Sequence, residues 1–304
     1  MKAVVTGGAG FIGSHLVEEL IKKGIEVHVL DNMTAGNLSN VHPLAVIHTE
    51  DICSIEAKRI ILKEKPDVVF HLAAQADVAR SINDPKYDAD VNINGTINML
   101  EACREITLKK FIFASTSGVY GDLQKDLISE EDLTVPVSYY GLSKLTAESY
   151  IRLFNHLYGI PYTILRYGNV YGPRQTAKGE GGVVAVFLER LKKGMPLNIH
   201  GNGEQTRDFI YVKDIVQANI ASIEGGNQHT VQISTTKSTS INQLLEILKQ
   251  IHSSKIEALH TSTRIGDIKH SCLDNKKARQ ILSWQPQFNI LDGITETYNY
   301  LSKN

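Results

Sequence analysis

Tyr140 and Lys144 are the residues of this chain whose types and spacing most directly suggest proton chemistry. If both lie on one helix, four residues of separation places them on the same face, one turn apart. An ammonium group beside a phenol favours the phenolate, which can act as a base near neutral pH. Tyrosine and lysine occur four apart by chance in many helices, so other motifs must decide whether the pair is catalytic.

Three glycines near the start of the chain have the context of a phosphate-binding turn. Gly7, Gly10 and Gly13 follow an apolar run at 2–5 that predicts a buried strand, and they open a helix predicted over 11–23. In such a turn the first glycine permits a tight bend, the second lets the backbone approach a pyrophosphate, and the third lets helix and strand pack closely. The phosphates would lie at the helix N-terminus, so the turn predicts a bound dinucleotide.

An acidic residue indicates which dinucleotide is bound. A second apolar run, 25–30, ends in Asp31 and Asn32, about 20 residues after the glycines, where a carboxylate binds a ribose 2′-hydroxyl. A carboxylate at that point would repel a 2′-phosphate. We therefore expect the cofactor to be NAD rather than NADP.

Strand-like and helical segments alternate along the first half of the chain. Further apolar runs lie at 45–49, 68–71, 111–114 and 163–165. This alternation predicts a parallel sheet covered by helices on both faces, with the carboxyl ends of its strands along one crevice. The expected fold class is α/β, a Rossmann-type doubly wound parallel sheet with a smaller α/β C-terminal substrate domain.

The pattern changes after Arg166 to glycine-rich loops and shorter elements. We expect residues 1–168, joined by about 208–234, to form the NAD-binding domain. Residues 169–207 and 235–304 are expected to form the substrate-binding domain.

Composition excludes several classes of partner. The 304 residues carry a net charge of −1 and no basic block, so nucleic acid is not expected as a partner. The chain has no apolar stretch long enough to cross a bilayer and no charged and apolar leader, and its three cysteines form no CxxC pair. The eleven histidines show no HExxH or paired ligand spacing. We therefore expect a cytoplasmic protein without a membrane or metal partner.

The chain resembles the extended short-chain dehydrogenase/reductase family, in its nucleotide-sugar epimerase and dehydratase branch. The glycine turn, Asp31, the Tyr140/Lys144 pair and the upstream Thr116 carry this resemblance, which covers nearly the whole chain. It implies that Asp51 and Ile52 contact the adenine and that Asn92 is the family's cofactor asparagine. The full set of cofactor contacts that it implies is Gly7, Gly10, Phe11, Ile12, Gly13, Asp31, Asn32, Asp51, Ile52, Leu72, Ala73, Ala74, Asn92, Ser115, Tyr140, Lys144 and Tyr167.

The resemblance also assigns the catalytic residues. Tyr140 is the base, Lys144 binds the nicotinamide ribose, and Thr116 orients the substrate oxygen that Tyr140 deprotonates. Dehydratases of this family usually place Asp-Glu directly after the threonine, whereas Ser117 and Gly118 stand here. Without an acid at those positions, elimination of water is not expected, and epimerisation or simple redox chemistry is favoured.

A second group of residues is implied to bind a nucleotide-sugar. Arg207 and Arg264 match the family's two diphosphate arginines, whose planar forks suit phosphate oxygens. Ser271 aligns with the position beside the hexose 2-substituent, where a small residue leaves room for an N-acetyl group. The substrate contacts implied in this way are Thr116, Ser117, Tyr140, Asn169, Arg174, Val183, Val184, Arg207, Arg264 and Ser271.

The activity that these residues imply is NAD-dependent 4-epimerisation of UDP-hexoses through a transient 4-keto sugar. UDP-glucose/UDP-galactose and UDP-GlcNAc/UDP-GalNAc are both open as substrates. Arg174 keeps open a UDP-glucuronate 4-epimerase, because an arginine after Gly-Pro meets the sugar carboxylate in related enzymes. Two further candidates are a nucleotide-sugar 4-ketoreductase and a non-catalytic NAD-sensing binder. The helices around 84–104 and 140–156 pair across a dimer in relatives, so a homodimer is expected.

Overall fold

The computed structural model describes residues 1–123, 125–177, 182–262 and 269–303. At its centre lies a seven-stranded sheet in the order β11-β6-β5-β4-β1-β2-β3, in which every neighbouring pair is parallel. The strand order reverses between β1 and β4, which makes the sheet doubly wound. The predicted fold class is confirmed. The strands are β1 (Lys2–Thr6), β2 (Glu26–Leu30), β3 (Val46–His48), β4 (Val68–His71), β5 (Lys110–Thr116), β6 (Tyr162–Tyr167) and β11 (His229–Ile233).

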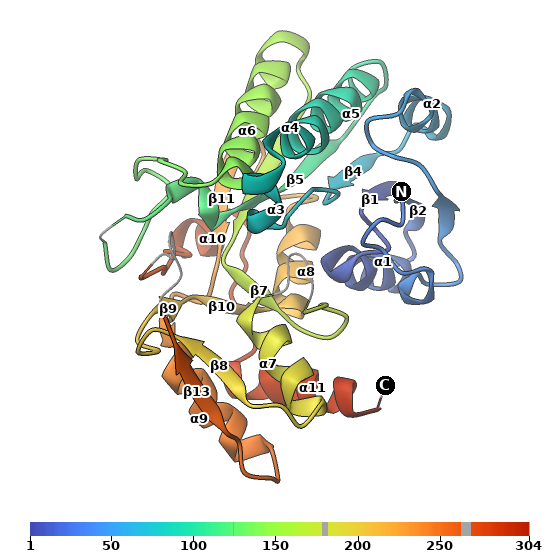
Figure 1. Cartoon of the computed structure of the whole chain (residues 1–304). Helices are drawn as coiled ribbons and strands as arrows, with labels where there is room; N and C mark the ends of the chain where they lie inside the picture. Colours follow the sequence, from blue (N-terminus) through green and yellow to red (C-terminus); the bar gives the residue numbers. More distant parts are fainter. Residues whose placement is uncertain (124, 178–181, 263–268, 304) are drawn as a thin grey trace.

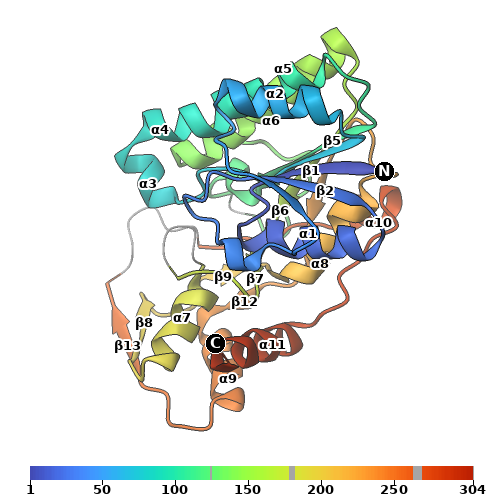
Figure 2. The ribbon, with the colours of Figure 1, turned by 90° about the vertical axis from the view of Figure 1, so that its right-hand side faces the viewer.

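Helices cover both faces of this sheet (Figure 2). Successive residues of β1 point to opposite faces: Val4 lies in the core on one side, while Ala3 and Val5 lie in the core on the other. A strand buried on both faces reads as a continuous apolar run, which is why the sequence reveals it. One face is covered by α2 (Ile55–Glu64), α5 (Gly95–Cys103) and α6 (Tyr139–Tyr158), and the other by α1 (Phe11–Lys22), α8 (Val212–Ala221) and α10 (Lys276–Ile281).

Short elements connect the sheet to its helices. Strand β4 leads into α3 (Val78–Asn83), α4 (Pro85–Ala89) and a π-helical turn, η2 (Asp90–Asn94), which continues directly into α5. Two 3₁₀ turns, η1 (Leu38–Asn40) and η3 (Ser117–Tyr120), follow β2 and β5.

A second lobe lies below the sheet, at the carboxyl ends of its strands (Figure 1). It has an apolar core of its own, to which Phe187, Leu197 and Leu244 contribute. It contains α7 (Val183–Lys192), α9 (Ile241–Ile251), α11 (Ile290–Lys303) and the strand pairs β7 (Asn169–Tyr171) with β10 (Phe209–Tyr211), β9 (Thr206–Arg207) with β12 (Thr239–Ser240), and β8 (Leu197–His200) with β13 (Ala258–Thr261).

One stretch of the C-terminal segment lies with the large sheet instead of the second lobe. Ala278, Leu282 and Trp284 are buried in the core between the sheet and α1/α8. Helix α10 packs against β11, so a segment expected in the substrate-binding domain covers the sheet. The physical reason is that these apolar side chains are buried in the core against the sheet.

The turn between β1 and α1 shows why glycine is needed at two of its positions. Gly7 has φ +70°, a left-handed conformation that favours glycine. A Cβ at Gly13 would overlap the carbonyl oxygen of Gly7, because α1 starts directly against the turn. At Gly10 a Cβ would lie 3.2 Å from the same oxygen, a tight but tolerable contact. The turn therefore depends sterically on Gly13 and much less on Gly10.

Alanine substitutions at Gly13 and Gly10 should show which effect of each glycine is on stability and which is on cofactor binding. Gly13→Ala should lower the free energy of unfolding by about 1–3 kcal/mol, the usual cost of overpacking, and should weaken NAD binding. Gly10→Ala should weaken NAD binding with a smaller loss of stability, because its methyl group would occupy space meant for phosphate. Chemical denaturation and NAD titration of both variants test this, and equal stability losses would contradict it.

Candidate active site

A cleft of about 420 Å³ lies at the carboxyl ends of β1, β2, β4, β5 and β6. This is the point where the strand order reverses, which is where doubly wound sheets bind their ligands. Every cofactor contact expected from the sequence lines the cleft except Asn92. The glycine turn, the end of β2 and the end of β5 thus come together although they are far apart in the chain.

Asp31 lines the cleft just after β2. It is buried, with Oδ2 accepting a hydrogen bond from the Ala9 N–H at 2.9 Å and Oδ1 accepting one from the Met33 N–H at 2.9 Å. These bonds join the glycine turn to the loop after β2. Nearby, Asn32 donates to Asp51 at 2.7 Å, which links the ends of β2 and β3 on the adenine side of the cleft.

Asn92 lies beneath the cleft rather than in its wall. Its Oδ1 accepts from the Gln75 N–H at 2.9 Å, and its Nδ2 donates to Ser143 Oγ at 3.0 Å. Ser143 in turn donates to the Tyr140 carbonyl at 3.0 Å. The π-helical turn directs Asn92 inward, where it ties the loop after β4 to the start of α6. A direct contact with the cofactor stays a prediction.

The catalytic candidates meet where β5 ends and α6 begins. Ser138 caps α6 by accepting from the Gly141 N–H at 3.1 Å, and Tyr140 and Lys144 both line the cleft one turn apart. Thr116, the last residue of β5, accepts from the Gly118 N–H at 3.0 Å. Its hydroxyl hydrogen can then be donated to a substrate oxygen.

Lys144 is almost wholly buried. Its Nζ lies 4.2 Å from the centre of the Phe113 ring, a cation–π contact. Burial, together with the charge of Lys144, lowers the pKa of His71 to about 3. His71 is therefore neutral and bridges Thr6 and Thr96 at 2.8 and 3.1 Å, which holds the end of β4 beside the cleft.

Gly141 permits the close approach of α6 to the turn after β5. A Cβ at this position would lie 2.5 Å from the Gly118 carbonyl oxygen. A larger residue would push the start of α6, and with it Tyr140, away from η3. Sequence reasoning gave this glycine no role.

A buried ion pair supports the end of β5. Glu148, on α6 one turn after Lys144, accepts from Ser115 Oγ at 2.6 Å and from Arg166 Nε and Nη2 at 2.9 and 2.6 Å. Arg166 Nη1 donates to the Tyr120 hydroxyl at 2.7 Å. These hydrogen bonds join β5, β6 and α6.

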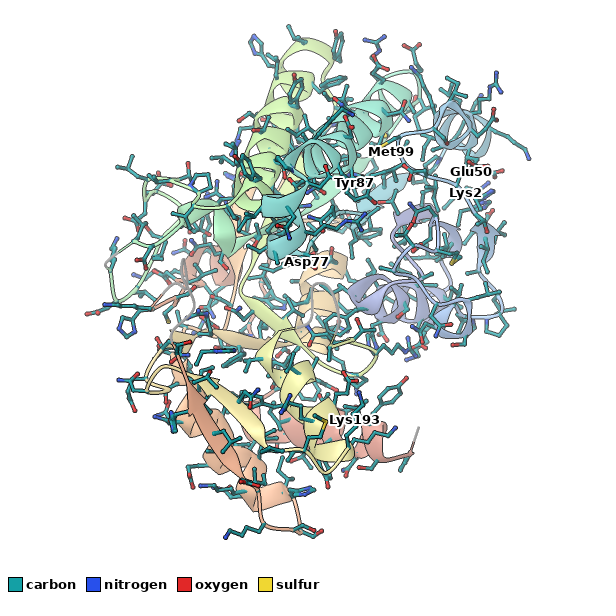
Figure 3. All side chains as sticks on the ribbon, viewed as in Figure 1. Lys2, Glu50, Asp77, Tyr87, Met99 and Lys193 are labelled. Atoms are coloured by element: carbon teal, nitrogen blue, oxygen red, sulfur yellow. The ribbon has the colours of Figure 1, made fainter. Side chains whose placement is uncertain are left out.

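Several lining residues were missed by sequence reasoning, because only the fold brings them to the cleft. The Arg80 guanidinium lies 4.0 Å from the centre of the Tyr87 ring at the α3–α4 side of the cleft. Figure 3 labels Tyr87 and Asp77 on this side. The missed residues include Thr34, Ala35, Gly36, Gln75, Asp77, Arg80, Tyr87 and Thr176.

Among the residues that the structure describes, the expected substrate contacts other than Tyr140 lie outside the lining of this cleft. Asn169 begins β7, where its N–H donates to the Asp208 carbonyl at 2.8 Å. Ser271 donates its N–H to the Thr206 carbonyl at 3.2 Å, beside Arg207 on β9. Ser117 lies in η3, next to Thr116.

The start of α7 presents main-chain donors. Val183 and Val184 form its first turn after Gly182, and no side chain caps it. A helix start of this kind suits an anion. Arg264 lies outside the described residues.

Arg174 does not reach the cleft in the structure. Its backbone has φ +70°, and its guanidinium donates to Ser14 Oγ at 3.1 Å and pairs with Glu18, both on α1. A contact of Arg174 with substrate stays a prediction, and it would require this guanidinium to leave Glu18. The physical reason is that Glu18 already neutralises the guanidinium and fixes its direction.

Among the described residues, no helix combines the length and apolar character that a membrane span requires.

Comparison with known proteins agrees with this geometry. The family model described as NAD dependent epimerase/dehydratase family matches residues 3–234. A putative UDP-glucose 4-epimerase of Methanocaldococcus jannaschii is 43% identical over 302 residues, covering 99% of this chain and 98% of that protein. A UDP-glucose 4-epimerase of Mycolicibacterium smegmatis is 36% identical over 307 residues, covering 99% of this chain and 98% of its own.

Solved structures show the same similarity. The UDP-glucose 4-epimerase of Thermotoga maritima, determined with UDP-glucose, superposes with a TM-score of 0.97 at 42% identity, covering 100% of this chain and 99% of that one. The UDP-glucose 4-epimerase of Thermus thermophilus, in complex with NAD, gives 0.94 at 36% identity, covering 99% of both chains. With its glycine turn, its Tyr140/Lys144 pair and these relatives, the chain belongs to the NAD-dependent epimerase/dehydratase family.

Proposed function

We propose that the chain is an NAD-dependent 4-epimerase that interconverts UDP-hexoses, with UDP-glucose/UDP-galactose and UDP-GlcNAc/UDP-GalNAc as candidate pairs. The observation that carries this proposal is the position of Tyr140 and Lys144 in the same cleft as the glycine turn and Asp31. One cleft can thus hold a dinucleotide and present a base to a sugar bound beside it.

The cofactor is NAD in this proposal. Gly7, Gly10 and Gly13 would hold its pyrophosphate at the start of α1, and Asp31 would accept from its adenosine ribose. When bound, NAD supplies the acceptor, and then the donor, of the hydrogen at sugar C4. A carboxylate fixed by two backbone N–H groups leaves no place for a 2′-phosphate.

The residues of the chain would handle the proton and orient the sugar. Tyr140 takes the proton from the sugar 4-hydroxyl as C4 is oxidised to a ketone, and Lys144 stabilises the phenolate. Thr116 donates a hydrogen bond to O4. The 4-keto sugar then turns within the site, C4 is reduced on its other face, and Tyr140 returns the proton. The reaction has no net oxidation.

The second lobe would bind the UDP moiety, so that the sugar can turn while its diphosphate stays fixed. Asn169, Arg207, Arg264 and the start of α7, with Val183 and Val184, are the proposed diphosphate contacts. Residues 169–207 and the C-terminal segment without α10 form this substrate-binding part in the proposal.

The choice of hexose rests on two positions. The small side chain of Ser271 leaves room for an N-acetyl group, and a UDP-N-acetylglucosamine 4-epimerase from Methanobrevibacter ruminantium M1 is 36% identical, with a TM-score of 0.95. A UDP-glucuronic acid 4-epimerase from Bacillus cereus is 32% identical. Because Arg174 is paired with Glu18, a uronate carboxylate has no partner in that guanidinium, and a neutral sugar is favoured.

Two other activities predict different results. A nucleotide-sugar 4-ketoreductase would consume NADH with each turnover. A non-catalytic NAD-sensing binder would not require Thr116, Tyr140 and Lys144 together, and this chain has all three.

The role of Tyr140 as the base can be tested by substituting it and its neighbour Tyr139 separately. Tyr140→Phe should abolish turnover of UDP-galactose and UDP-GalNAc while NAD remains bound, because the phenylalanine keeps the packing and loses the hydroxyl. Tyr139→Phe is the matched control, since Tyr139 is exposed and outside the cleft. Chromatographic separation of the 4-epimers measures the rates. Turnover that survived in Tyr140→Phe would rule out Tyr140 as the base.

A homodimer and a cytoplasmic location are part of the proposal. Helix α6 exposes a stripe of large apolar side chains, Leu142, Leu153 and Leu157, and Ile82 of α3 is also exposed. A second copy of the chain would cover this surface. The cysteines are free thiols, which suits a reducing compartment.

A charge on the stripe should separate the subunits. Leu153→Glu should give a monomer, because a carboxylate would be buried at the subunit contact. Leu133→Glu, at an exposed position in the loop before α6, is the control. Sedimentation analysis distinguishes the two states, and a wild-type chain that sediments as a monomer would disprove the dimer.

A further inference from the structure

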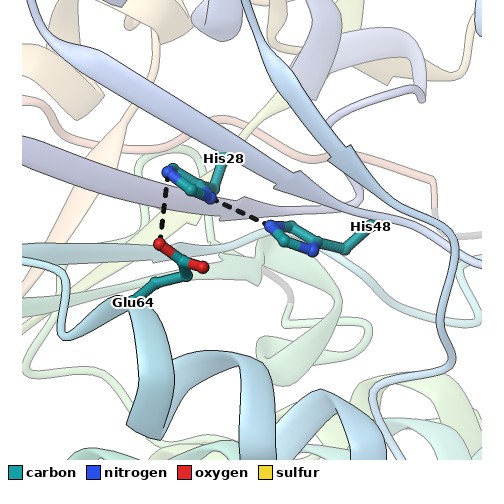
Figure 4. A group of neighbouring side chains, drawn as sticks. All are labelled: His28, His48 and Glu64. Atoms are coloured by element: carbon teal, nitrogen blue, oxygen red, sulfur yellow. Dashed lines mark hydrogen bonds and ion pairs between the residues drawn. The ribbon is translucent and has the colours of Figure 1, made fainter.

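Two histidines and a glutamate lie together at the β3 edge of the sheet, away from Tyr140 and Lys144 (Figure 4). His28 lies on β2, His48 on the edge strand β3, and Glu64 at the end of α2. The parallel register places His48 opposite Leu30, two residues beyond His28, so both histidines lie on the same face of the sheet. Helix α2 covers that face and brings Glu64 to them.

The three side chains lie close enough to share one ion. The imidazole rings are stacked, with centroids 5.2 Å apart, and His28 Nδ1 lies 2.9 Å from His48 Nε2. Glu64 Oε2 lies 3.6 Å from Nε2 of the His28 ring. One ligand atom from each histidine and one from Glu64 all lie within 4.8 Å of one another. Two imidazole nitrogens with a carboxylate oxygen are a donor set that zinc and similar divalent metals prefer.

A fourth residue fixes the orientation of His28. Its Nε2 lies 3.0 Å from Glu26 Oε1, a carboxylate oxygen that can accept a hydrogen bond from this nitrogen. The proton of His28 is therefore on Nε2, and the lone pair of Nδ1 points toward His48. Carboxylates orient metal-binding histidines in the same way.

Two lysines near the cluster lower its affinity for a cation but do not block the site. Lys2 Nζ lies 3.1 Å from Glu26 Oε1 and 3.1 Å from Glu64 Oε2, and Lys63 Nζ lies 3.7 Å from Glu64 Oε1. Lys63 is largely exposed and can turn to solvent. His48 Nε2 can bind an ion when the proton of this ring is on Nδ1.

We propose that His28, His48 and the Glu64 carboxylate form a binding site for a divalent transition metal of the zinc class, with water as the fourth ligand. Tetrahedral zinc with bonds of about 2.0 Å needs ligand nitrogens about 3.3 Å apart, whereas His28 Nδ1 and His48 Nε2 lie 2.9 Å apart, so the rings have to separate and turn to let both lone pairs reach the ion. The bound ion would join β2, β3 and α2. Strand β3 leads directly to Glu50 and Asp51 in the wall of the cleft, so the ion would also stabilise the adenine side.

The test is titration of the full chain, stripped with a chelator, with Zn²⁺ alone. The wild type should bind one Zn²⁺ per chain and unfold at a higher temperature with it. His48→Gln should weaken binding at least about tenfold, as expected for the loss of a ligand, and should abolish the thermal shift. His229→Gln is the matched control, because His229 is an exposed histidine on the opposite edge strand, β11.

The visible spectrum of the Co²⁺-loaded wild type gives a second readout that needs no variant. Strong absorption typical of tetrahedral cobalt supports the site. Failure of the wild type to bind Zn²⁺, or equal binding by His48→Gln and His229→Gln, would overturn it. If His48→Gln does not fold, the cobalt spectrum decides, and its absence in the wild type overturns the proposal.

Discussion

The buried ion pair of Glu148 and Arg166 is the interaction on which the catalytic end of the molecule depends. It joins α6 to β5 and β6, and through Ser115 it fixes the residue before Thr116. Removal of Glu148 would leave Arg166 without its carboxylate in the core, at a typical cost of about 3–5 kcal/mol, whereas Glu148 without Arg166 would keep the hydrogen bond from Arg152 at 2.7 Å. The pair sets the position of the end of β5, which carries Thr116, relative to α6, which carries Tyr140 and Lys144.

Close backbone contacts complete the same arrangement. Gly13 lets α1 begin against the turn after β1, and Gly141 lets α6 begin against the turn after β5. Two helix starts therefore lie close to strand ends on either side of the cleft. One of them is suited to phosphate and the other to proton transfer, and the second lobe faces both. The proposed mechanism, in which the cofactor stays fixed and the sugar turns, uses this arrangement.

Sequence reasoning predicted the sheet and the cofactor half of the site because their signals are local. A strand buried on both faces is an apolar run, and the glycine turn and the Tyr140/Lys144 pair are short motifs. What it missed depends on contacts between distant segments. The packing of α10 against β11, the inward position of Asn92 and the pairing of Arg174 with Glu18 are set by neighbours that no spacing rule identifies. The histidine and glutamate cluster belongs to the same class, since its members come from three separate elements.

The central claim is that oxidation and reduction at C4 occur on one sugar, in one site, without release of cofactor. The most direct measurement is conversion of UDP-galactose and UDP-GalNAc carrying deuterium at C4, without added cofactor, with the products analysed by mass spectrometry. We predict a stable mixture of 4-epimers in which the deuterium is retained. No conversion, even with added NAD, or conversion that requires stoichiometric NADH and a keto-sugar, would contradict the account.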